Sequence, residues 1–235
     1  MKVLLPRPPA QAEPFAAALR AEGFEPVVAE VTRIVPTDPG PLDAALGRVW
    51  RWVVFTSANA VTATVARGRP RGRIAAVGER TAAALAAAGL AVDLVPKDKT
   101  GAGLARALAA ADDLSGAEIL FPRAEEGRDE AAELLAAAGA RVTLVPAYRT
   151  VPLAPDELAP LHARLRAGEI DAIAFFAPSQ IAPLRPALGG VRILAAIGPT
   201  TAEALSASGL RADVVAPEPT AEALARALAA RYRSV

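Results

Sequence analysis

Six short segments of the chain carry small, hydroxylated or charged residues directly after an apolar run that predicts a strand. In an open parallel sheet, ligands bind beyond the carboxyl ends of the strands, where the next helices begin. Free backbone N–H groups and the helix dipole make such positions suitable for carboxylates or phosphates. The segments are Arg7-Pro8, Thr56-Ser57-Ala58-Asn59, Gly78-Glu79-Arg80-Thr81, Arg123-Ala124-Glu125, Ala177-Pro178-Ser179-Gln180 and Gly198-Pro199-Thr200-Thr201.

Hydroxylated residues at these positions also have a purely structural interpretation. Ser57, Ser179 and Thr200 are residue types that cap helix N-termini, and each one alone is better explained as a cap. Six such segments together favour binding of an acidic ligand. Arg7 and Arg123 are the strongest candidates for a charged contact, and an ordinary surface role stays open for both.

The elements that position these segments follow from hydrophobic periodicity. Short Val, Ile, Leu and Phe runs alternate with Ala- and Leu-rich stretches at helical spacing, which predicts an α/β protein with parallel sheets. Strands are expected near 3–5, 52–55, 74–77, 119–121, 142–145, 172–175 and 193–197, with weaker ones near 26–28, 93–95 and 213–215. Expected helices include 14–22, 79–88, 128–138 and 200–208.

The chain also repeats itself. Ala76-Val77-Gly78 recurs as Ala196-Ile197-Gly198, and the offset is 196 − 76 = 120 residues. The same offset relates Val53-Val54-Phe55 to Ile173-Ala174-Phe175, and Thr100…Leu104 to Thr220…Leu224. Unrelated segments do not keep one register over several motifs. We therefore predict a tandem duplication, with two similar lobes that face each other across a ligand-binding cleft.

Composition excludes several classes of protein. The 235 residues carry a formal net charge of +1, so no overall field attracts nucleic acid or an anionic membrane. The absence of cysteine excludes disulfides, thiolate catalysis and cysteine-ligated metals. His162 is the single histidine, and no carboxylate cluster at metal-ligand spacing surrounds it. With no apolar stretch long enough for a signal peptide or a membrane span, we expect a cytoplasmic protein.

The motifs, in their order and spacing, resemble the uroporphyrinogen-III synthase family over nearly the whole chain. The matching stretches are Phe55-Thr56-Ser57-Ala58-Asn59-Ala60-Val61, Ala76-Val77-Gly78-Glu79-Arg80-Thr81, Gly127-Arg128-Asp129, Gly139-Ala140-Arg141-Val142, Tyr148-Arg149-Thr150, Ala196-Ile197-Gly198-Pro199-Thr200-Thr201-Ala202 and Pro217-Glu218-Pro219-Thr220. Each stretch is short, and the specificity lies in their combination.

The resemblance implies two flavodoxin-like domains joined by a two-stranded linker, with the duplicated pieces exchanged between them. One domain would comprise residues 1–36 with 153–235, and the inserted domain residues 37–147. Linkers are expected near 31–36 and 148–152, where β-branched residues precede Pro36 and Pro152.

The resemblance also implies a reaction. The family converts the linear tetrapyrrole hydroxymethylbilane to uroporphyrinogen III, inverting ring D through a spiro intermediate and losing water, without metal or organic cofactor. Tyr148 matches a cleft tyrosine of the family and is the candidate general acid. Its alternative is a linker tyrosine packed by its ring, with its hydroxyl bonded to backbone. The implied substrate contacts are Arg7, Thr56, Ser57, Ala58, Asn59, Gly78, Glu79, Arg80, Thr81, Arg123, Ser179, Gln180, Gly198, Thr200 and Thr201.

Two other functions fit the same pattern. A non-enzymatic two-lobed module that binds an acidic small molecule would share both fold and cleft, because fold alone does not assign function. A sensor domain of a regulator is the third reading, although we see no DNA-binding extension in the sequence. For the synthase reading we expect a monomer whose partners are substrate and product, without nucleic acid or membrane.

Overall fold

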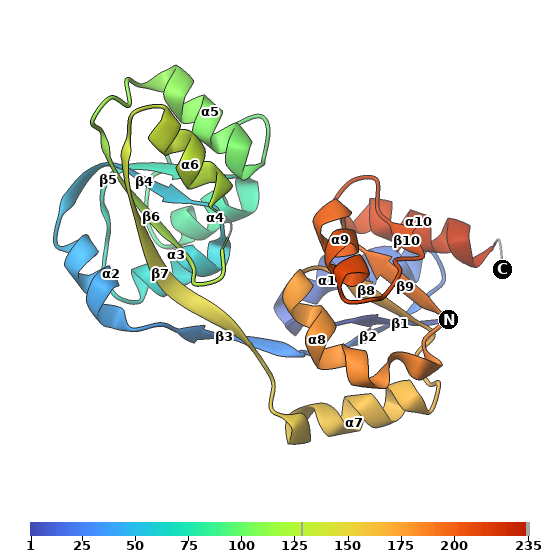
Figure 1. Ribbon diagram of the computed structural model, residues 1–235. Helices are drawn as coiled ribbons and strands as arrows, with labels where there is room; N and C mark the ends of the chain where they lie inside the picture. Colours follow the sequence, from blue (N-terminus) through green and yellow to red (C-terminus); the bar gives the residue numbers. More distant parts are fainter. Residues whose placement is uncertain (128, 234–235) are drawn as a thin grey trace. The chain divides into compact units, whose positions relative to one another are not determined.

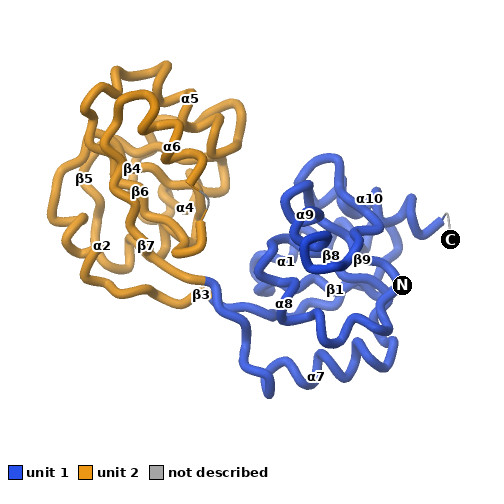
Figure 2. Tube along the Cα trace, in the orientation of Figure 1, with its two compact units in different colours: residues 1–33, 150–235 blue, residues 34–149 orange. Residues whose placement is uncertain are grey.

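The computed structural model describes residues 1–127 and 129–233, and the chain divides into two compact units (Figures 1 and 2). Unit 1 comprises Met1–Arg33 with Thr150–Val235, and unit 2 comprises Ile34–Arg149. The sequence predicted domain boundaries a few residues away, with one domain at 1–36 and 153–235 and the other at 37–147. Arg128, which belongs to one of the family motifs, lies outside the described residues.

Unit 1 is built on a parallel five-stranded sheet. Its strands are β1 (Lys2–Leu5), β2 (Glu25–Val28), β8 (Ala172–Phe175), β9 (Ile193–Ala196) and β10 (Val214–Val215), in the order β10-β9-β8-β1-β2. One face packs against α1 (Pro9–Ala21) and α10 (Ala221–Tyr232). The other face packs against α7 (Pro155–Arg166), α8 (Ile181–Leu184) and α9 (Pro199–Ala207).

Unit 2 has the same three layers. Its sheet has the order β3-β7-β6-β4-β5, with β3 (Thr32–Pro36), β4 (Val49–Phe55), β5 (Arg71–Ala76), β6 (Glu118–Ala124) and β7 (Arg141–Pro152). Strands β4 to β7 are parallel. Helices α2 (Pro39–Leu46), α3 (Ala58–Val65) and α4 (Glu79–Ala87) pack on one face, and α5 (Gly101–Ala111) and α6 (Glu130–Ala137) on the other.

The strand orders are consistent with an exchanged duplication. Each sheet combines two strands from one repeat with three from the second. Unit 1 follows the flavodoxin order 2-1-3-4-5, and the four strands of unit 2 other than the edge strand β3 follow the order 2-1-3-4. Equivalent side chains 120 residues apart also make equivalent bonds. Asp93 accepts from Ile74 N at 2.7 Å, and Asp213 accepts from Leu194 N at 2.9 Å. The prediction of parallel α/β sheets is confirmed.

Some predicted elements have different bounds. Helix α1 begins at Pro9 and contains Pro14, whereas the sequence pattern predicted the helix start at Pro14 itself. Pro14 is exposed, so water can bond the carbonyl that the missing N–H leaves unpaired. The expected strand near 93–95 is reduced to one bridge between Ala75 and Leu94. Strand β7 runs without a break through the expected linker near 148–152.

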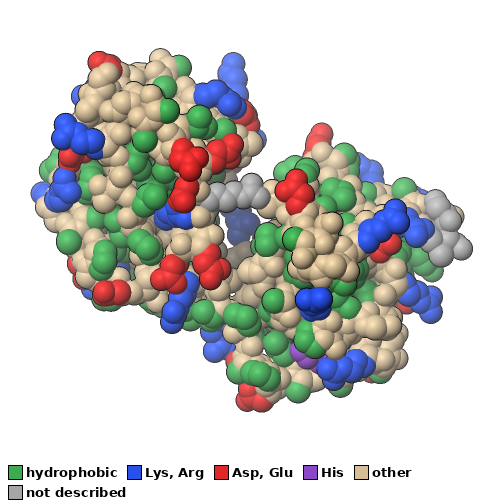
Figure 3. All heavy atoms as spheres, in the orientation of Figure 1, with side chains coloured by type: hydrophobic (Ala, Val, Ile, Leu, Met, Phe, Trp, Pro, Cys, Tyr) green, Lys and Arg blue, Asp and Glu red, His purple; other side chains and the backbone are tan. Residues whose placement is uncertain are grey.

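The four arginines between residues 67 and 73 bond to groups within unit 2. Basic and acidic side chains are mixed over the visible face in Figure 3. The arginines cap helix ends or pair with acids: Arg67 with Asp43, Arg69 with the carbonyls of Ala88 and Gly89, Arg71 with that of Gly47, and Arg73 with Asp112. Among the described residues, no helix is long and apolar enough to cross a bilayer.

Asp112 is the centre of this charged network. Its carboxylate accepts from Arg51 Nε at 2.8 Å and from the buried Trp52 Nε1 at 2.9 Å. These hydrogen bonds, that of Arg51 first, hold the pKa of Asp112 far below its usual range. The folded state therefore binds this proton less readily than the unfolded chain does, so the carboxylate contributes stability above the ordinary carboxyl pKa.

We predict that Asp112→Asn lowers the melting temperature at pH 7 by on the order of a few °C. The difference from the parent should shrink as the pH falls below about 4, because the unfolded carboxyl is then protonated. Tryptophan fluorescence is the probe, since both tryptophans, Trp50 and Trp52, lie in unit 2. Exposed Glu203 in unit 1 gives the control, Glu203→Gln, which should leave the transition unchanged.

Candidate active site

The structure groups the six predicted segments into two sets of three, one at the carboxyl edge of each sheet. In unit 2, β5, β4 and β6 are neighbours, so the segments Thr56–Asn59 and Gly78–Thr81, which follow β4 and β5, lie beside the end of β6. Arg123 was predicted to follow this strand, but β6 extends to Ala124 and includes it. In unit 1, β9, β8 and β1 are neighbours, and they bring together Gly198–Thr201, Ala177–Gln180 and Arg7.

Ser57 connects the start of α3 to Tyr148. It is the N-cap residue of the helix, and its Oγ accepts from the backbone N–H of Asn59 at 3.1 Å. The Tyr148 hydroxyl donates to the same Oγ at 3.1 Å. The predicted capping role of Ser57 is therefore confirmed, and the cap also joins two hydroxyl groups that can relay a proton.

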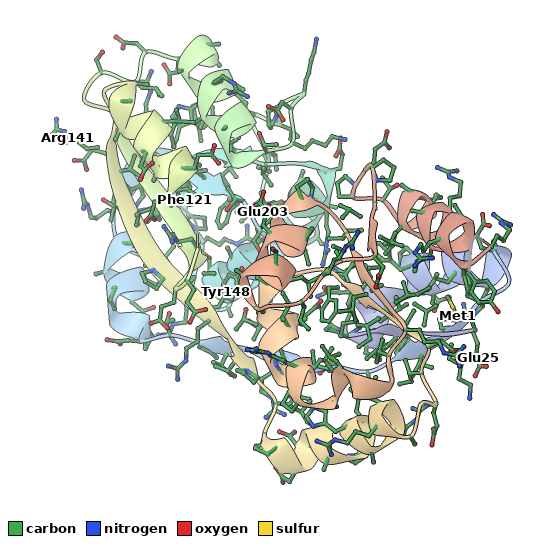
Figure 4. All side chains as sticks on the ribbon, turned by 45° about the vertical axis from the view of Figure 1, so that its right-hand side comes forward. Met1, Glu25, Phe121, Arg141, Tyr148 and Glu203 are labelled. Carbon is green, nitrogen blue, oxygen red and sulfur yellow. The ribbon has the colours of Figure 1, made fainter. Side chains whose placement is uncertain are left out.

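Tyr148 lies on β7 with a buried ring, 7% exposed, in the core that α2, α3 and α4 cover (Figure 4). It lines a pocket of about 510 Å³ whose walls are mostly apolar. The alternative from the sequence, a packed tyrosine bonded to backbone, is correct for the ring only, because the hydroxyl's partner is a side chain. The other lining residues are Ile34, Pro36, Thr37, Asp38, Pro39, Leu42, Asn59, Thr62, Ala63, Ala66, Arg67 and Ala147.

At the start of α4, an acidic ligand would meet backbone N–H donors more than polar side chains. Gly78 is its N-cap residue, and Thr81, in the first turn, is 4% exposed. Glu79 forms an ion pair with Lys99 at 2.8 Å, and this hydrogen bond is the main reason why the pKa of Glu79 is lowered. The ionised carboxylate disfavours an acidic group beside it. Arg80 is exposed.

A second pocket, of about 480 Å³, lies beside Thr56 and was not predicted from the sequence. It includes the start of α5, where Thr100 is the N-cap residue and accepts from Gly103 N at 2.9 Å. The sequence did contain a signal for this helix start, because Thr100 recurs 120 residues later as Thr220, the N-cap residue of α10. The remaining lining residues are Gly101, Ala102, Phe121, Glu130 and Ala131.

Arg123 supports the loop between β6 and α6. Its side chain is 10% exposed, and its guanidinium donates to the Asp129 carboxylate and to the carbonyls of Gly127 and Ala124. A Cβ on Gly127 would lie 2.7 Å from Arg123 Nε, so only glycine leaves room for this arrangement. In this structure Arg123 shapes the loop that borders the second pocket.

In unit 1, the segment 177–180 differs from the expectation. The sequence predicted a helix start, but the structure has a single 3₁₀ turn, Pro178–Gln180, followed by the four-residue helix α8. Pro183 has no N–H to bond to the carbonyl of Ser179, so a regular helix does not continue from the turn. Gln180 is 7% exposed and bonds to three backbone groups, while Ser179 is half-buried.

The start of α9 repeats that of α4. Gly198 is the N-cap residue in extended backbone, Thr200 is exposed, and Thr201 is 3% exposed. Residues 201–210 have the same pattern of buried and exposed positions as residues 81–90. Among the described residues, no group of three or more His, Asp or Glu side chains is placed to hold a metal ion.

Comparison with known proteins settles the family. The model of the family described as uroporphyrinogen-III synthase HemD matches residues 13–226. The chain belongs to the uroporphyrinogen-III synthase family. Its relatives named as synthases are enzymes, so the reading as a non-enzymatic binding module is not supported.

Individual relatives agree with this family. The chain is 34% identical to uroporphyrinogen-III synthase of Synechococcus elongatus, over 63% of this chain and 60% of that protein, less than two thirds of its length. It is 29% identical to a putative uroporphyrinogen-III synthase of Methanothermobacter thermautotrophicus, with 90% of both chains covered. A third relative, from Chlorobaculum parvum, is 26% identical over 91% of this chain and 92% of that protein.

Solved structures of the family share the fold. A mutant uroporphyrinogen III synthase from Thermus thermophilus superposes with a TM-score of 0.63 at 21% identity and full coverage of both chains. Uroporphyrinogen-III synthetase from Helicobacter pylori gives a TM-score of 0.64 at 18% identity, with 99% of both chains covered. At these identities the likeness shows the two-domain α/β fold alone.

Proposed function

We propose that this chain cyclises hydroxymethylbilane to uroporphyrinogen III, inverting ring D through a spiro intermediate and losing water. The observation that carries the proposal is the family match, which spans residues 13–226 and thus parts of both units. The two pockets and the helix starts at the sheet edge of unit 2 are features that such a reaction needs, since the substrate is large and acidic.

The substrate's carboxylates would be held chiefly by backbone N–H groups. The eight-residue α3 and the nine-residue helices α4 and α9 begin at the predicted segments, and their dipoles favour negative charge. The contacts proposed at these starts are Thr56, Ser57, Ala58, Asn59, Gly78, Arg80, Thr81, Gly198, Thr200 and Thr201. Arg7 would add a charged contact, whereas Glu79, Arg123 and Gln180 would act by shaping loops.

Tyr148 would act as the general acid. Its proton would pass to the terminal hydroxyl, the C–O bond would break, and water would leave. The substituted carbon of the last pyrrole would then attack the electrophilic carbon to form the spiro intermediate. After that intermediate reopens and recloses, loss of a proton restores the aromatic ring, so the net change is the loss of one water. Positioning of the two chain ends would supply much of the rate.

Ser57 fits this role as the partner of the acid. Because its Oγ holds the Tyr148 hydroxyl at 3.1 Å, the phenol is oriented before substrate binds. A monomeric state and a cytoplasmic location remain predictions from the sequence.

The product isomer tests the proposal. Freshly generated hydroxymethylbilane should yield uroporphyrinogen III with the folded protein, whereas the uncatalysed closure gives the uninverted isomer I. Separation of the oxidised products by chromatography distinguishes the isomers, and heat-unfolded protein is the control. Formation of isomer I alone with folded protein would refute the function.

A further inference from the structure

Arg7 occupies an unusual position at the sheet edge of unit 1. Its guanidinium carbon lies 4.4 Å from the ring centroid of Phe176 and 5.0 Å from that of Phe15. The two rings contact each other edge to face, with centroids 4.6 Å apart. A guanidinium over two aromatic rings is held by cation–π attraction, which fixes the orientation of its plane.

The backbone around Arg7 is fixed as well. Pro6 and Pro8 flank it, and each proline ring restricts its own φ. Arg7 N donates to Leu5 O at 2.8 Å, which closes a tight turn after β1. The backbone of Arg7 is therefore part of a stiff loop, and less conformational entropy is lost when the residue binds a ligand.

Gln180 joins this loop to the backbone of Phe176. Its Nε2 donates to Pro6 O at 2.8 Å, and its Oε1 accepts from Phe176 N at 2.7 Å and Ala177 N at 3.3 Å. The side chain is buried, so these bonds are protected from water. One amide thus links the loops after the adjacent strands β1 and β8, which carry Arg7 and Phe176.

We propose that Arg7, held over Phe15 and Phe176, is a preorganised site for one carboxylate of the ligand, and that Phe176 and Gln180 are its positioning residues. The identity of that ligand as a tetrapyrrole rests on the proposed function. A planar guanidinium matches a carboxylate with two parallel hydrogen bonds, which a lysine cannot reproduce. Gln180, for which the sequence predicted substrate contact, acts through Arg7 instead.

A double-mutant cycle tests the site without turnover. The probe is uroporphyrin III, the oxidised octacarboxylic form of the expected product, and its Kd is measured by fluorescence. Arg7→Ala should raise Kd about tenfold and Phe176→Leu about threefold to tenfold. In the Arg7→Ala background, Phe176→Leu should change Kd less than about twofold, because the ring then has no cation to position. Gln180→Leu should behave like Phe176→Leu in both backgrounds.

Two further variants separate positioning from packing. Phe176→Tyr keeps an aromatic ring and should bind like the parent. Phe24→Leu removes another ring from the same core cluster, and Kd should not change. Equal effects of Phe176→Leu with and without Arg7 would overturn the proposal, as would an unchanged Kd in Arg7→Ala. The isomer assay is independent: isomer III without coupling refutes this site alone, and coupling without isomer III refutes the synthase function alone.

Discussion

Tyr148→Phe should lower the single-turnover rate of uroporphyrinogen III formation by about 10²- to 10⁴-fold, the usual contribution of one general acid. The reaction should not be abolished, because the variant keeps the buried ring and the pocket that positions the substrate. Rapid mixing with freshly generated hydroxymethylbilane, followed by quenching and isomer separation, gives the rate.

The other tyrosine provides a matched control. The chain has two tyrosines, and Tyr232 is 51% exposed at the end of α10 in unit 1. Tyr232→Phe should leave the rate unchanged. An unchanged rate in Tyr148→Phe would remove this residue from the chemistry and leave the pocket a positioning role only.

Ser57→Ala tests how much the orientation of the Tyr148 hydroxyl contributes to the rate, apart from the contribution of the hydroxyl itself. The variant keeps the Tyr148 hydroxyl but removes its hydrogen-bond partner, so the loss should be the worth of one hydrogen bond, roughly threefold to tenfold in rate. A loss as large as that of Tyr148→Phe would instead indicate that Ser57 itself handles the proton.

Strand positions were predictable because buried parallel strands are continuous apolar runs. The runs at 172–175 and 193–197 coincide with β8 and β9 to within one residue, and all four residues of β8 are buried. Helix bounds were less predictable where proline was involved. In α1, Pro14 lies on the exposed side of a helix that begins at Pro9. This start depends on how the helix packs against the sheet of unit 1.

Residue types identified the positions of the site but not the direction of each side chain. Gln180 follows the end of β8, as predicted, whereas Arg123 lies inside β6, one residue before its end. The polar atoms of both side chains bond to backbone groups, Arg123 to Gly127 O and Gln180 to Pro6 O in the loop after β1. The same residue types could have faced a ligand, and only three-dimensional contacts separate the two cases. Phe176 was missed for the same reason, since its proposed role depends on its distance to Arg7.

The role of Gly101-Ala102-Gly103 was also not clear from residue types. Its glycines suggest a dinucleotide loop, but the third glycine of that motif is missing. The structure gives Gly103 a steric reason. A Cβ there would lie 2.1 Å from the Asp98 carbonyl oxygen, which is backbone and cannot move aside without displacing the loop before α5. The equivalent position 120 residues later holds Ala223, 5% exposed, so the second repeat tolerates a methyl group where the first does not.

We expect Gly103→Ala to destabilise unit 2 by ~2–4 kcal/mol, because overpacking against backbone forces α5 away from the Asp98 loop. For a unit of this size, the melting temperature should fall by on the order of 10 °C. Tryptophan fluorescence reports this transition, since Trp50 and Trp52 lie in unit 2. The start of α5 also borders the pocket beside Thr56, so uroporphyrin III binding should weaken even below the transition.

Two matched variants decide whether the effect is steric. Ala223→Gly makes the reciprocal change in unit 1 and should cost only ~0.5–1 kcal/mol, the ordinary penalty of glycine in a helix. Gly198→Ala adds a methyl group where, in the described part of the chain, no atom beyond those of its sequence neighbours lies within 4 Å, so the melting temperature should stay close to that of the parent. If Gly103→Ala also melts with the parent, the close approach of Asp98 is not a feature of the folded protein. If the melting temperatures of all three variants fall by the same amount, crowding against Asp98 is not the cause of the loss in Gly103→Ala.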